Sequence, residues 1–116
     1  MKTNTISEAP YCQIKHSWRK LQQLDQVLKE KYNVCLNQAI LLCCLSQRCK
    51  NQGNIAGETG LTPTQTSRVL SKLENKGLIE RTIGADDKRK MVFALTIKGQ
   101  KKLEEITPEG VRFLAH

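Results

Sequence analysis

The chain has 116 residues and a mass of 13.1 kDa, the size of one domain. It carries 19 Lys and Arg against 11 Asp and Glu, and its 39 % hydrophobic and 26 % charged residues make an ordinary globular composition. The longest apolar run, residues 39–45, falls far short of the roughly 18 residues that a membrane span needs, and the first ten residues are polar, unlike a secretory signal. These features argue against a two-domain enzyme, a membrane protein and a secreted disulfide scaffold, and they predict a cytoplasmic protein.

The positive charge is concentrated in the middle of the chain. Residues 50–102 contain 11 basic and 5 acidic side chains, whereas residues 103–116 contain 1 basic and 3 acidic ones. A basic segment of this length favours a polyanionic partner, most simply DNA or RNA. The alternative is a basic surface that only keeps the protein soluble.

Five cysteines are present, an odd number, and without an export signal this argues against a disulfide framework. Because there is no C-x-x-C pair and only two histidines, we expect no metal site and no cofactor. Cys43 and Cys44 lie in an apolar run, where cysteine acts as a small hydrophobic residue. Structural thiols are the preferred interpretation, and Cys12 is the candidate for a redox-sensitive one.

Two helices are predicted in the first half of the chain. From Pro10 to Tyr32, apolar residues recur every three or four positions, which predicts an amphipathic helix with one apolar stripe. Residues 38–49 follow Asn37, a candidate N-cap, and are apolar on most sides. We expect this second helix to be the buried centre of the fold.

A third, short helix is predicted over residues 55–60. The turn residues 51–54 precede it, Asn54 is its candidate cap, and Gly60 ends it where a left-handed residue is wanted. Gly57 inside it is unfavourable, by about 1 kcal/mol relative to Ala.

The strongest local signal is the segment Thr62-Pro63-Thr64-Gln65. It has a capping hydroxyl, proline at the first helical position and glutamine at the third, which together form a capping box. The predicted helix runs through Lys76 and stops at Gly77. Its inward stripe is Thr66, Val69, Leu70 and Leu73, and its other side carries Thr64, Gln65, Ser67, Arg68, Ser71 and Lys72.

Two helices joined by a glycine turn, the second with a polar and basic outer face, describe a helix-turn-helix. Such a helix fits the major groove, where Arg and Gln can donate to base edges and Thr and Ser can reach bases or phosphates. Its N-terminus also offers unpaired N–H groups to a phosphate. The alternative is an ordinary helical hairpin with a solvated face.

A β-hairpin is predicted after the helix-turn-helix. Residues 78–83 and 91–95 are β-like runs that flank the charged loop GADDKRK. A hairpin with a basic tip in this place is a wing, and a protruding arginine can enter a narrow minor groove. The alternative is a plain solvent-exposed hairpin.

Thr96 can cap a further helix over residues 97–106. Thr107-Pro108 is expected to end it, and a last short helix would follow. The predicted fold is therefore mainly α with a small β-hairpin wing, in the order α-α-(α-turn-α)-β-β-α.

Several strings between residues 55 and 99 resemble one known family. They are Ile55-Ala56, Gly60-Leu61-Thr62-Pro63, Thr66-Ser67-Arg68-Val69-Leu70, Leu73-Glu74, Lys76-Gly77-Leu78-Ile79, Arg81, Asp87-x-Arg89 and Leu95-Thr96-x-x-Gly99. The last string together with Asp87-x-Arg89 is the most specific part. The pattern resembles that of the MarR family of winged-helix transcription regulators.

The resemblance implies a DNA interface with the recognition helix, about residues 63–76, in the major groove and the wing, about 78–95, in the minor groove. Arg89 matches the family's wing arginine, and Asp87 the acidic residue that orients it. The candidate DNA-binding residues are Thr62, Thr64, Gln65, Ser67, Arg68, Lys72, Arg81, Asp87, Lys88, Arg89 and Lys90. Some members of the family sense oxidants through a cysteine near a tyrosine in the first helix, which Cys12 beside Tyr11 matches.

The resemblance also implies a homodimer held by the terminal helices, with an effector site beside them. We expect an N-terminal arm and dimerisation helix over residues 1–36, a DNA-binding domain over 37–99, and a short helical region over 100–116. The expected break at Thr107-Pro108 would remove much of the usual C-terminal interface. The alternatives are a dimer that depends on the first helix, which is the preferred one, a dimer that uses a different contact, and no dimer at all.

The function that these patterns favour is a sequence-specific regulator that binds double-stranded DNA, acts as a repressor and responds to a small molecule or an oxidant. The alternative is a winged-helix adaptor that binds a protein instead of specific DNA. An enzyme is disfavoured because the sequence has no nucleophile triad, phosphate loop or H-E-x-x-H motif.

Overall fold

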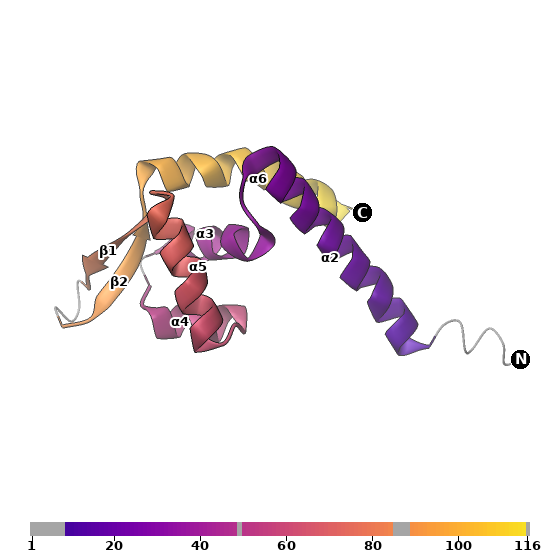
Figure 1. Ribbon diagram of the computed structural model, residues 1–116, viewed down its shortest axis with the longest axis horizontal. Helices are drawn as coiled ribbons and strands as arrows, with labels where there is room; N and C mark the ends of the chain where they lie inside the picture. Colours follow the sequence, from indigo (N-terminus) through magenta and orange to yellow (C-terminus); the bar gives the residue numbers. More distant parts are fainter. Residues whose placement is uncertain (1–8, 49, 85–88, 116) are drawn as a thin grey trace, which may run out of the picture.

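The computed structural model describes residues 9–48, 50–84 and 89–115. Its elements in chain order are helices α2 (Pro10–Tyr32), α3 (Leu36–Gln47), α4 (Gln52–Thr59) and α5 (Pro63–Asn75), strands β1 (Ile79–Ile83) and β2 (Met91–Leu95), and helix α6 (Ile97–Ala115). Figure 1 shows α3 in the middle of the molecule, α4 below it, α5 running past it between the level of α6 and α4, the hairpin at one end and α6 across the top. None of the helices in this described part is long and apolar enough to cross a membrane.

Helix α3 is the centre of the hydrophobic core, as predicted. Leu41 and Leu42 are 0 % exposed and Leu45 is 4 % exposed. The core cluster around them draws on every other element, including Leu28 of α2, Ile55 of α4, Leu70 and Leu73 of α5, Phe93 of β2 and Ile106 of α6. The helix-turn-helix, the hairpin and the outer helices therefore share one core.

The start of α3 differs from the prediction that Asn37 caps it. The helix begins at Leu36 after the N-cap residue Cys35, and Asn37 lies inside it. The Leu36 N–H donates to Asp25 Oδ1 of α2 at 2.7 Å, and the Cys35 N–H donates to Gln38 Oε1 at 3.3 Å. A carboxylate from another helix thus does part of the capping, and the bond from Leu36 holds the pKa of Asp25 below its ordinary value.

Helix α4 also begins earlier than predicted. Its N-cap is Asn51, whose side-chain oxygen accepts the Asn54 N–H at 2.8 Å, so the segment 51–54 is the first turn of the helix. Both asparagines can cap a helix, and the earlier one does so here; Ile55, fully buried, lies one turn into α4. The predicted end at Gly60 is confirmed, with φ of +77°.

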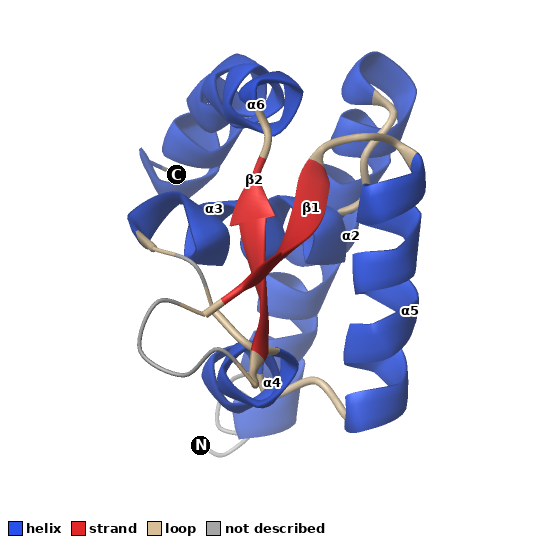
Figure 2. Ribbon diagram, turned by 90° about the vertical axis from the view of Figure 1, so that its left-hand side faces the viewer, coloured by secondary structure: helices blue, strands red, loops and turns tan. Residues whose placement is uncertain are grey.

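The hairpin forms as predicted, and it gains a neighbour that the sequence did not indicate. Strands β1 and β2 are antiparallel, and Arg81 faces Phe93 in the register. Lys50 exchanges two backbone hydrogen bonds with Phe93, at 3.1 and 2.8 Å, on the other edge of β2. The Lys50 side chain is 4 % exposed and its ammonium pairs with Glu58 of α4 at 2.8 Å. Figure 2 shows the strands between α6 above and α4 below, with α5 alongside.

Helix α6 corrects the prediction of a break at Thr107-Pro108. It runs unbroken for 19 residues with Pro108 inside it. Proline in a helix costs about 3 kcal/mol, because it removes one hydrogen bond and its ring crowds the previous turn. Contacts beyond the proline offset this cost: Glu109 is 9 % exposed, accepts from Tyr32 of α2 at 3.3 Å and pairs with Arg112. The C-terminal helix is therefore longer than expected and packs on α2.

The first half of α2 extends away from the body (Figure 1). Its apolar stripe is exposed: Tyr11 by 83 %, Ile14 by 56 %, Trp18 by 59 % and Leu21 by 39 %. Leu28 is the buried residue of this helix. The amphipathic pattern predicted the helix correctly, but within one chain most of the stripe has nothing to cover it.

Replacement of Gly99 tests how closely α6 approaches the rest of the fold. A Cβ at Gly99 would lie 1.9 Å from the Leu78 carbonyl oxygen, so Gly99→Ala must push the start of α6 away from the backbone that leads into β1. We expect a loss of about 2–3 kcal/mol in the free energy of unfolding, measured by urea titration. Gly57→Ala is the matched control: nothing lies within 4 Å of its Cβ, and it should stabilise by up to about 1 kcal/mol. Equal effects of the two substitutions would contradict this packing.

Candidate nucleic-acid interface

The turn between α4 and α5 sets the angle of the second helix. Gly60 takes the left-handed conformation and its N–H donates to the Ala56 carbonyl at 2.9 Å, which closes α4. The Leu61 N–H donates to the Thr59 hydroxyl at 3.3 Å. These local bonds satisfy the backbone of a tight turn, so α5 starts from a fixed point.

The capping box predicted at the start of α5 is confirmed. Thr62 Oγ1 accepts the Gln65 N–H at 3.1 Å, and Gln65 Oε1 accepts the Thr62 N–H at 3.0 Å. Both side chains are exposed. Thr62 and Gln65 therefore hold the helix N-terminus open to solvent, and the Gln65 amide nitrogen remains as a donor on its outer side.

Helix α5 separates an apolar face from a polar one. Thr66 and Leu73 are 0 % exposed, Leu70 is 2 % and Val69 is 9 %, which confirms the predicted inward stripe. The opposite side carries the exposed residues Thr64, Ser67, Arg68, Ser71 and Lys72. Because four buried side chains fix the rotation of the helix, the polar face points outward in one orientation.

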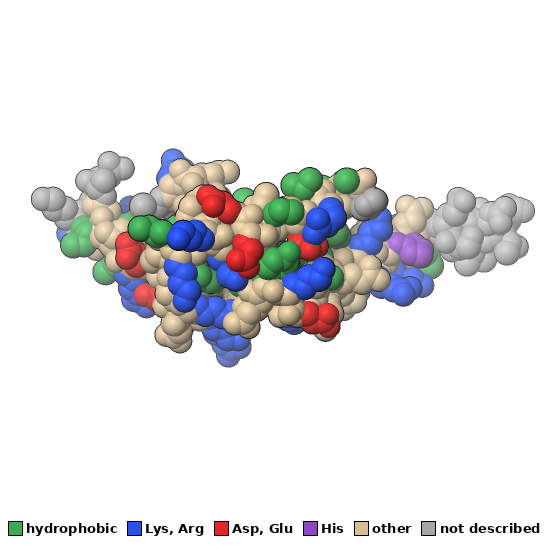
Figure 3. Space-filling view, turned by 90° about the horizontal axis from the view of Figure 1, so that it is seen from above, with side chains coloured by type: hydrophobic (Ala, Val, Ile, Leu, Met, Phe, Trp, Pro, Cys, Tyr) green, Lys and Arg blue, Asp and Glu red, His purple; other side chains and the backbone are tan. Residues whose placement is uncertain are grey.

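This face differs in charge from the side of the molecule that α6 covers. The exposed charges on the outer side of α5 are the cations Arg68 and Lys72. On the α6 side, acidic and basic side chains alternate with apolar ones (Figure 3). A polyanion would therefore meet a more uniformly positive surface at α5.

Two of the basic residues predicted for the wing, Arg89 and Lys90, are among the residues that the structure describes. Arg89 and Lys90 are exposed and directly precede β2. The Gly84 N–H donates to the Lys90 carbonyl at 2.9 Å. Asp87 and Lys88 lie outside the described residues. Ile83 and Met91 form the outermost strand pair, 60 % and 49 % exposed.

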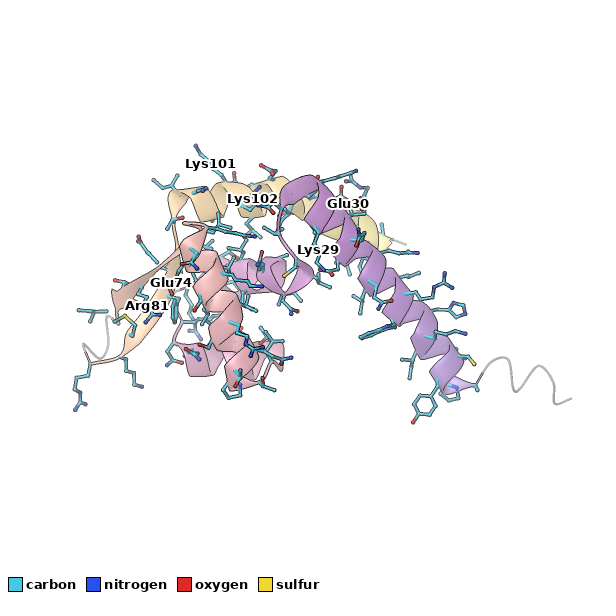
Figure 4. The ribbon with its side chains drawn as sticks, viewed as in Figure 1. Lys29, Glu30, Glu74, Arg81, Lys101 and Lys102 are labelled. Atoms are coloured by element: carbon cyan, nitrogen blue, oxygen red, sulfur yellow. The ribbon has the colours of Figure 1, made fainter. Side chains whose placement is uncertain are left out.

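Arg81, predicted to contact DNA, is engaged within the protein. Its guanidinium binds both carboxylate oxygens of Glu74, at 2.9 and 3.2 Å, and lies 5.5 Å from the centre of the Phe93 ring. Figure 4 shows Arg81 and Glu74 reaching toward each other from β1 and α5. Sequence reasoning missed Glu74 because its partner lies seven residues away in a different element, where no periodicity links them. The pair ties the wing to the recognition helix.

The cysteines that the structure describes lie in α2, in α3 and in the connection between these helices. Cys12 is half-buried near the start of α2, Cys35 precedes α3, and Cys43 is exposed on α3. Burial raises the pKa of the Cys44 thiol, which favours the protonated thiol over the thiolate. Within the described residues, no group of three or more His, Cys, Asp or Glu side chains could hold a metal ion.

Together, α4, the turn, α5 and the hairpin make a winged helix-turn-helix, the class of fold to which nucleic-acid-binding domains commonly belong. The model of the MarR family matches residues 37–91. A structure of MepR from S. aureus in its DNA-binding conformation is 30 % identical, with a TM-score of 0.79, and covers 90 % of this chain and 78 % of that one. The chain belongs to the MarR family.

Two other solved structures extend the comparison. The MepR–DNA complex from S. aureus is 28 % identical with a TM-score of 0.77, and the match covers 90 % of this chain and 78 % of that one. The transcriptional regulator BldR from Sulfolobus solfataricus is 20 % identical, has a TM-score of 0.82 and covers 98 % of this chain and 83 % of its own. No protein of curated function matches the chain by sequence.

Two threonines at the start of α5 should differ in how much they contribute to the stability of the fold. Thr62→Ala removes the cap and should lower the free energy of unfolding by about 1 kcal/mol, measured by urea titration. Thr64→Ala, two residues on and exposed, should change it by less than about 0.5 kcal/mol. If Thr62→Ala were as neutral as Thr64→Ala, the capping box would not be holding the helix start.

Proposed function

We propose that this chain is a sequence-specific regulator of transcription that binds double-stranded DNA and represses by occupying its site. The observation that carries the proposal is the outward polar and basic face of α5, held in one orientation by its buried stripe. Family membership and the likeness to the MepR–DNA complex support it. Such a role requires no catalytic residues.

The recognition helix supplies the base and phosphate contacts in this proposal. The partial positive charge at its N-terminus favours a phosphate nearby, while the Gln65 N–H itself is bound by Thr62 Oγ1. Thr64, Gln65 and Ser67 reach base edges or the backbone from the first two turns, and Arg68 can donate two bonds to a guanine. Lys72, further along the same face, is suited to a phosphate.

The wing supplies the flanking contacts. Arg89 and Lys90 are proposed to lie in or along the minor groove, where a narrow groove concentrates negative potential. Lys88, Asp87 and the Glu74-bound Arg81 support the same surface, Arg81 through the position of β1 rather than through direct contact. This proposal assigns residues 37–99 to DNA binding.

A homodimer follows from the outer helices. Residues 1–36 and 100–116 would form the interface, with the exposed stripe of α2 meeting a second copy. Val111 and Leu114 of α6, 60 % and 84 % exposed, add to the apolar surface. The unbroken α6 gives the interface more length than the sequence suggested.

An effector site is proposed on the same face, where the cavity wall shares Leu21, Val111 and Leu114 with the proposed interface. A cavity of about 450 Å³ lies between α2, α3 and α6, with an almost wholly apolar wall that includes Leu24, Leu36, Ile106 and Phe113. It suits an apolar small molecule better than a charged one. Related structures include CouR bound to p-coumaroyl-CoA, and BpsR, whose DNA binding is regulated by 6-hydroxynicotinic acid. An oxidant acting at Cys12 is the second proposed effector class.

DNA binding is tested by selecting duplexes from a random library with the wild-type chain and measuring affinity by fluorescence anisotropy. Affinity should fall steeply as salt rises, since phosphate contacts release counterions. Arg68→Ala should cost about 1–3 kcal/mol and relax the preference at one base pair, and Arg89→Ala should weaken binding. Lys101→Ala on the exposed side of α6 is the control and should have little effect. Selection of no duplex would favour the protein-adaptor alternative.

Dimerisation is tested by light scattering of Trp18→Glu. The wild-type chain should have a mass of about 26 kDa, twice that of the monomer, and the variant should shift toward 13.1 kDa because it buries a charge in the interface. His16→Glu adds the same charge on the opposite side of α2 and should stay dimeric. A monomeric wild-type chain would contradict the proposed interface.

A further inference from the structure

Three lysine side chains meet where α2 and α5 end. Lys76 Nζ donates to the Asn33 carbonyl at 2.6 Å and to Gln38 Oε1 at 2.9 Å. Lys102 Nζ of α6 donates to the Tyr32 carbonyl at 3.2 Å. Lys98 Nζ, also of α6, donates to the carbonyl of Lys76 itself at 2.9 Å. We call Lys76, Lys98 and Lys102 the lysine junction.

Each of these ammonium groups binds the end of a helix to which it does not belong. The last carbonyls of a helix have no partner within it and carry partial negative charge, so a cation there is favourable. Tyr32 and Asn33 end α2, and Lys76 ends α5. Because the donors come from α5 and α6, the same bonds that complete the helix ends also set the positions of α2, α5 and α6 relative to one another.

Lys76 is the central member of the lysine junction. Burial lowers the pKa of its amine, and the nearby charges of Lys72 and Lys102 act in the same direction. In the part of the chain that the structure describes, no carboxylate pairs with it. Its charge is instead held by the Asn33 carbonyl and by Gln38, a side chain only 5 % exposed that also binds the start of α3. A surface lysine that merely aids solubility would not be placed against such partners.

A small tilt of α5 at the lysine junction would displace the proposed DNA contacts at the other end of the helix by a larger distance. Helix α5 has 13 residues, so its N-terminus lies about 20 Å from Lys76. A tilt of about 10° at the Lys76 end would move the N-terminus by roughly 3 Å over that length. This displacement is as large as a hydrogen bond is long, so it would break the contacts that base readout needs.

We propose that the lysine junction positions the recognition helix against α2 and α6, so that Lys76 and Lys102 control DNA affinity without touching DNA. The inference rests on the proposed DNA binding. The lysine junction also connects α5 to α2 and α6, the helices that form the face assigned to the second copy and to the effector. A change in their packing would reach α5 through these bonds.

The test compares two of the junction lysines, Lys76 and Lys102, each with a matched lysine nearby. Lys76→Met and Lys102→Met remove the charge and keep the length of the side chain. Lys72→Met lies one turn away on the groove face of α5, and Lys101→Met is the neighbour of Lys102 whose side chain points away from the body (Figure 4). The affinity of all four variants for the duplex selected by the wild-type chain is measured over a series of salt concentrations.

We expect Lys76→Met and Lys102→Met to bind about tenfold more weakly at every salt concentration, with an unchanged slope of log affinity against log salt. Lys72→Met should lower that slope by about one, the signature of a lost phosphate contact. Lys101→Met should change neither quantity. Lys76→Arg retains charge and donors, and should recover most of the lost affinity.

A measurement without DNA separates this inference from the proposed function. Hydrogen exchange in Lys76→Met should speed up at residues 33–38 and 76–79 and stay as in the wild type at the amides of α4. If Lys76→Met bound like the wild type, lowered the salt slope as Lys72→Met does, or left exchange at those residues unchanged, the inference would be overturned. Failure of the wild-type chain to select any duplex would instead remove the proposed function.

Discussion

The burial of one side of α5 is the constraint on which the rest of the structure depends. Thr66, Val69, Leu70 and Leu73 are removed from water against the core that α3 organises. These four buried side chains fix the rotation of α5 about its own axis. The polar side chains on its other side therefore point outward. The capping box at Thr62 fixes where the helix begins, and the lysine junction holds its C-terminal end against α2 and α6. Function follows from this placement, since the same residues on a helix free to rotate would present no defined surface.

The second constraint is the apolar surface that remains exposed. The α2 stripe and the end of α6 together leave Tyr11, Trp18, Val111 and Leu114 at least 59 % exposed. A patch of this kind on a small protein marks an interaction site. The apolar side chains Leu28 and Ile106 join the α2–α6 face to the core, and polar bonds at Tyr32, Asn33 and Glu109 add to this packing. Such bonds can be rearranged at modest cost, which suits a regulator that must change affinity.

The features that the sequence predicted well are those encoded by neighbouring residues. The capping box, the left-handed Gly60, the inward stripe of α5 and the two strands each depend on residues within one element or one turn. They account for the order of the elements and for the outward face of the candidate site. The choice of base-contacting residues within that face stays a prediction, since it depends on a partner outside the chain.

The features that the sequence did not predict depend on residues far apart. Asn37 was expected to cap α3, but Asp25 of α2 satisfies the first N–H group instead. Pro108 was expected to end the last helix. The helix continues past it, where Glu109 accepts a hydrogen bond from Tyr32, a residue 77 positions earlier in the chain. The pairs Glu74–Arg81 and Lys76–Asn33 were missed for the same reason: no local pattern records a contact between elements.

The central claim is that two copies of α5 read one DNA site. Hydroxyl-radical footprinting of the duplex selected by the wild-type chain tests it most directly. The account predicts two protected patches related by symmetry, with centres about one helical turn or roughly 10 bp apart, and flanking protection where the wings lie. A single protected patch, or uniform protection without sequence register, would contradict the claim.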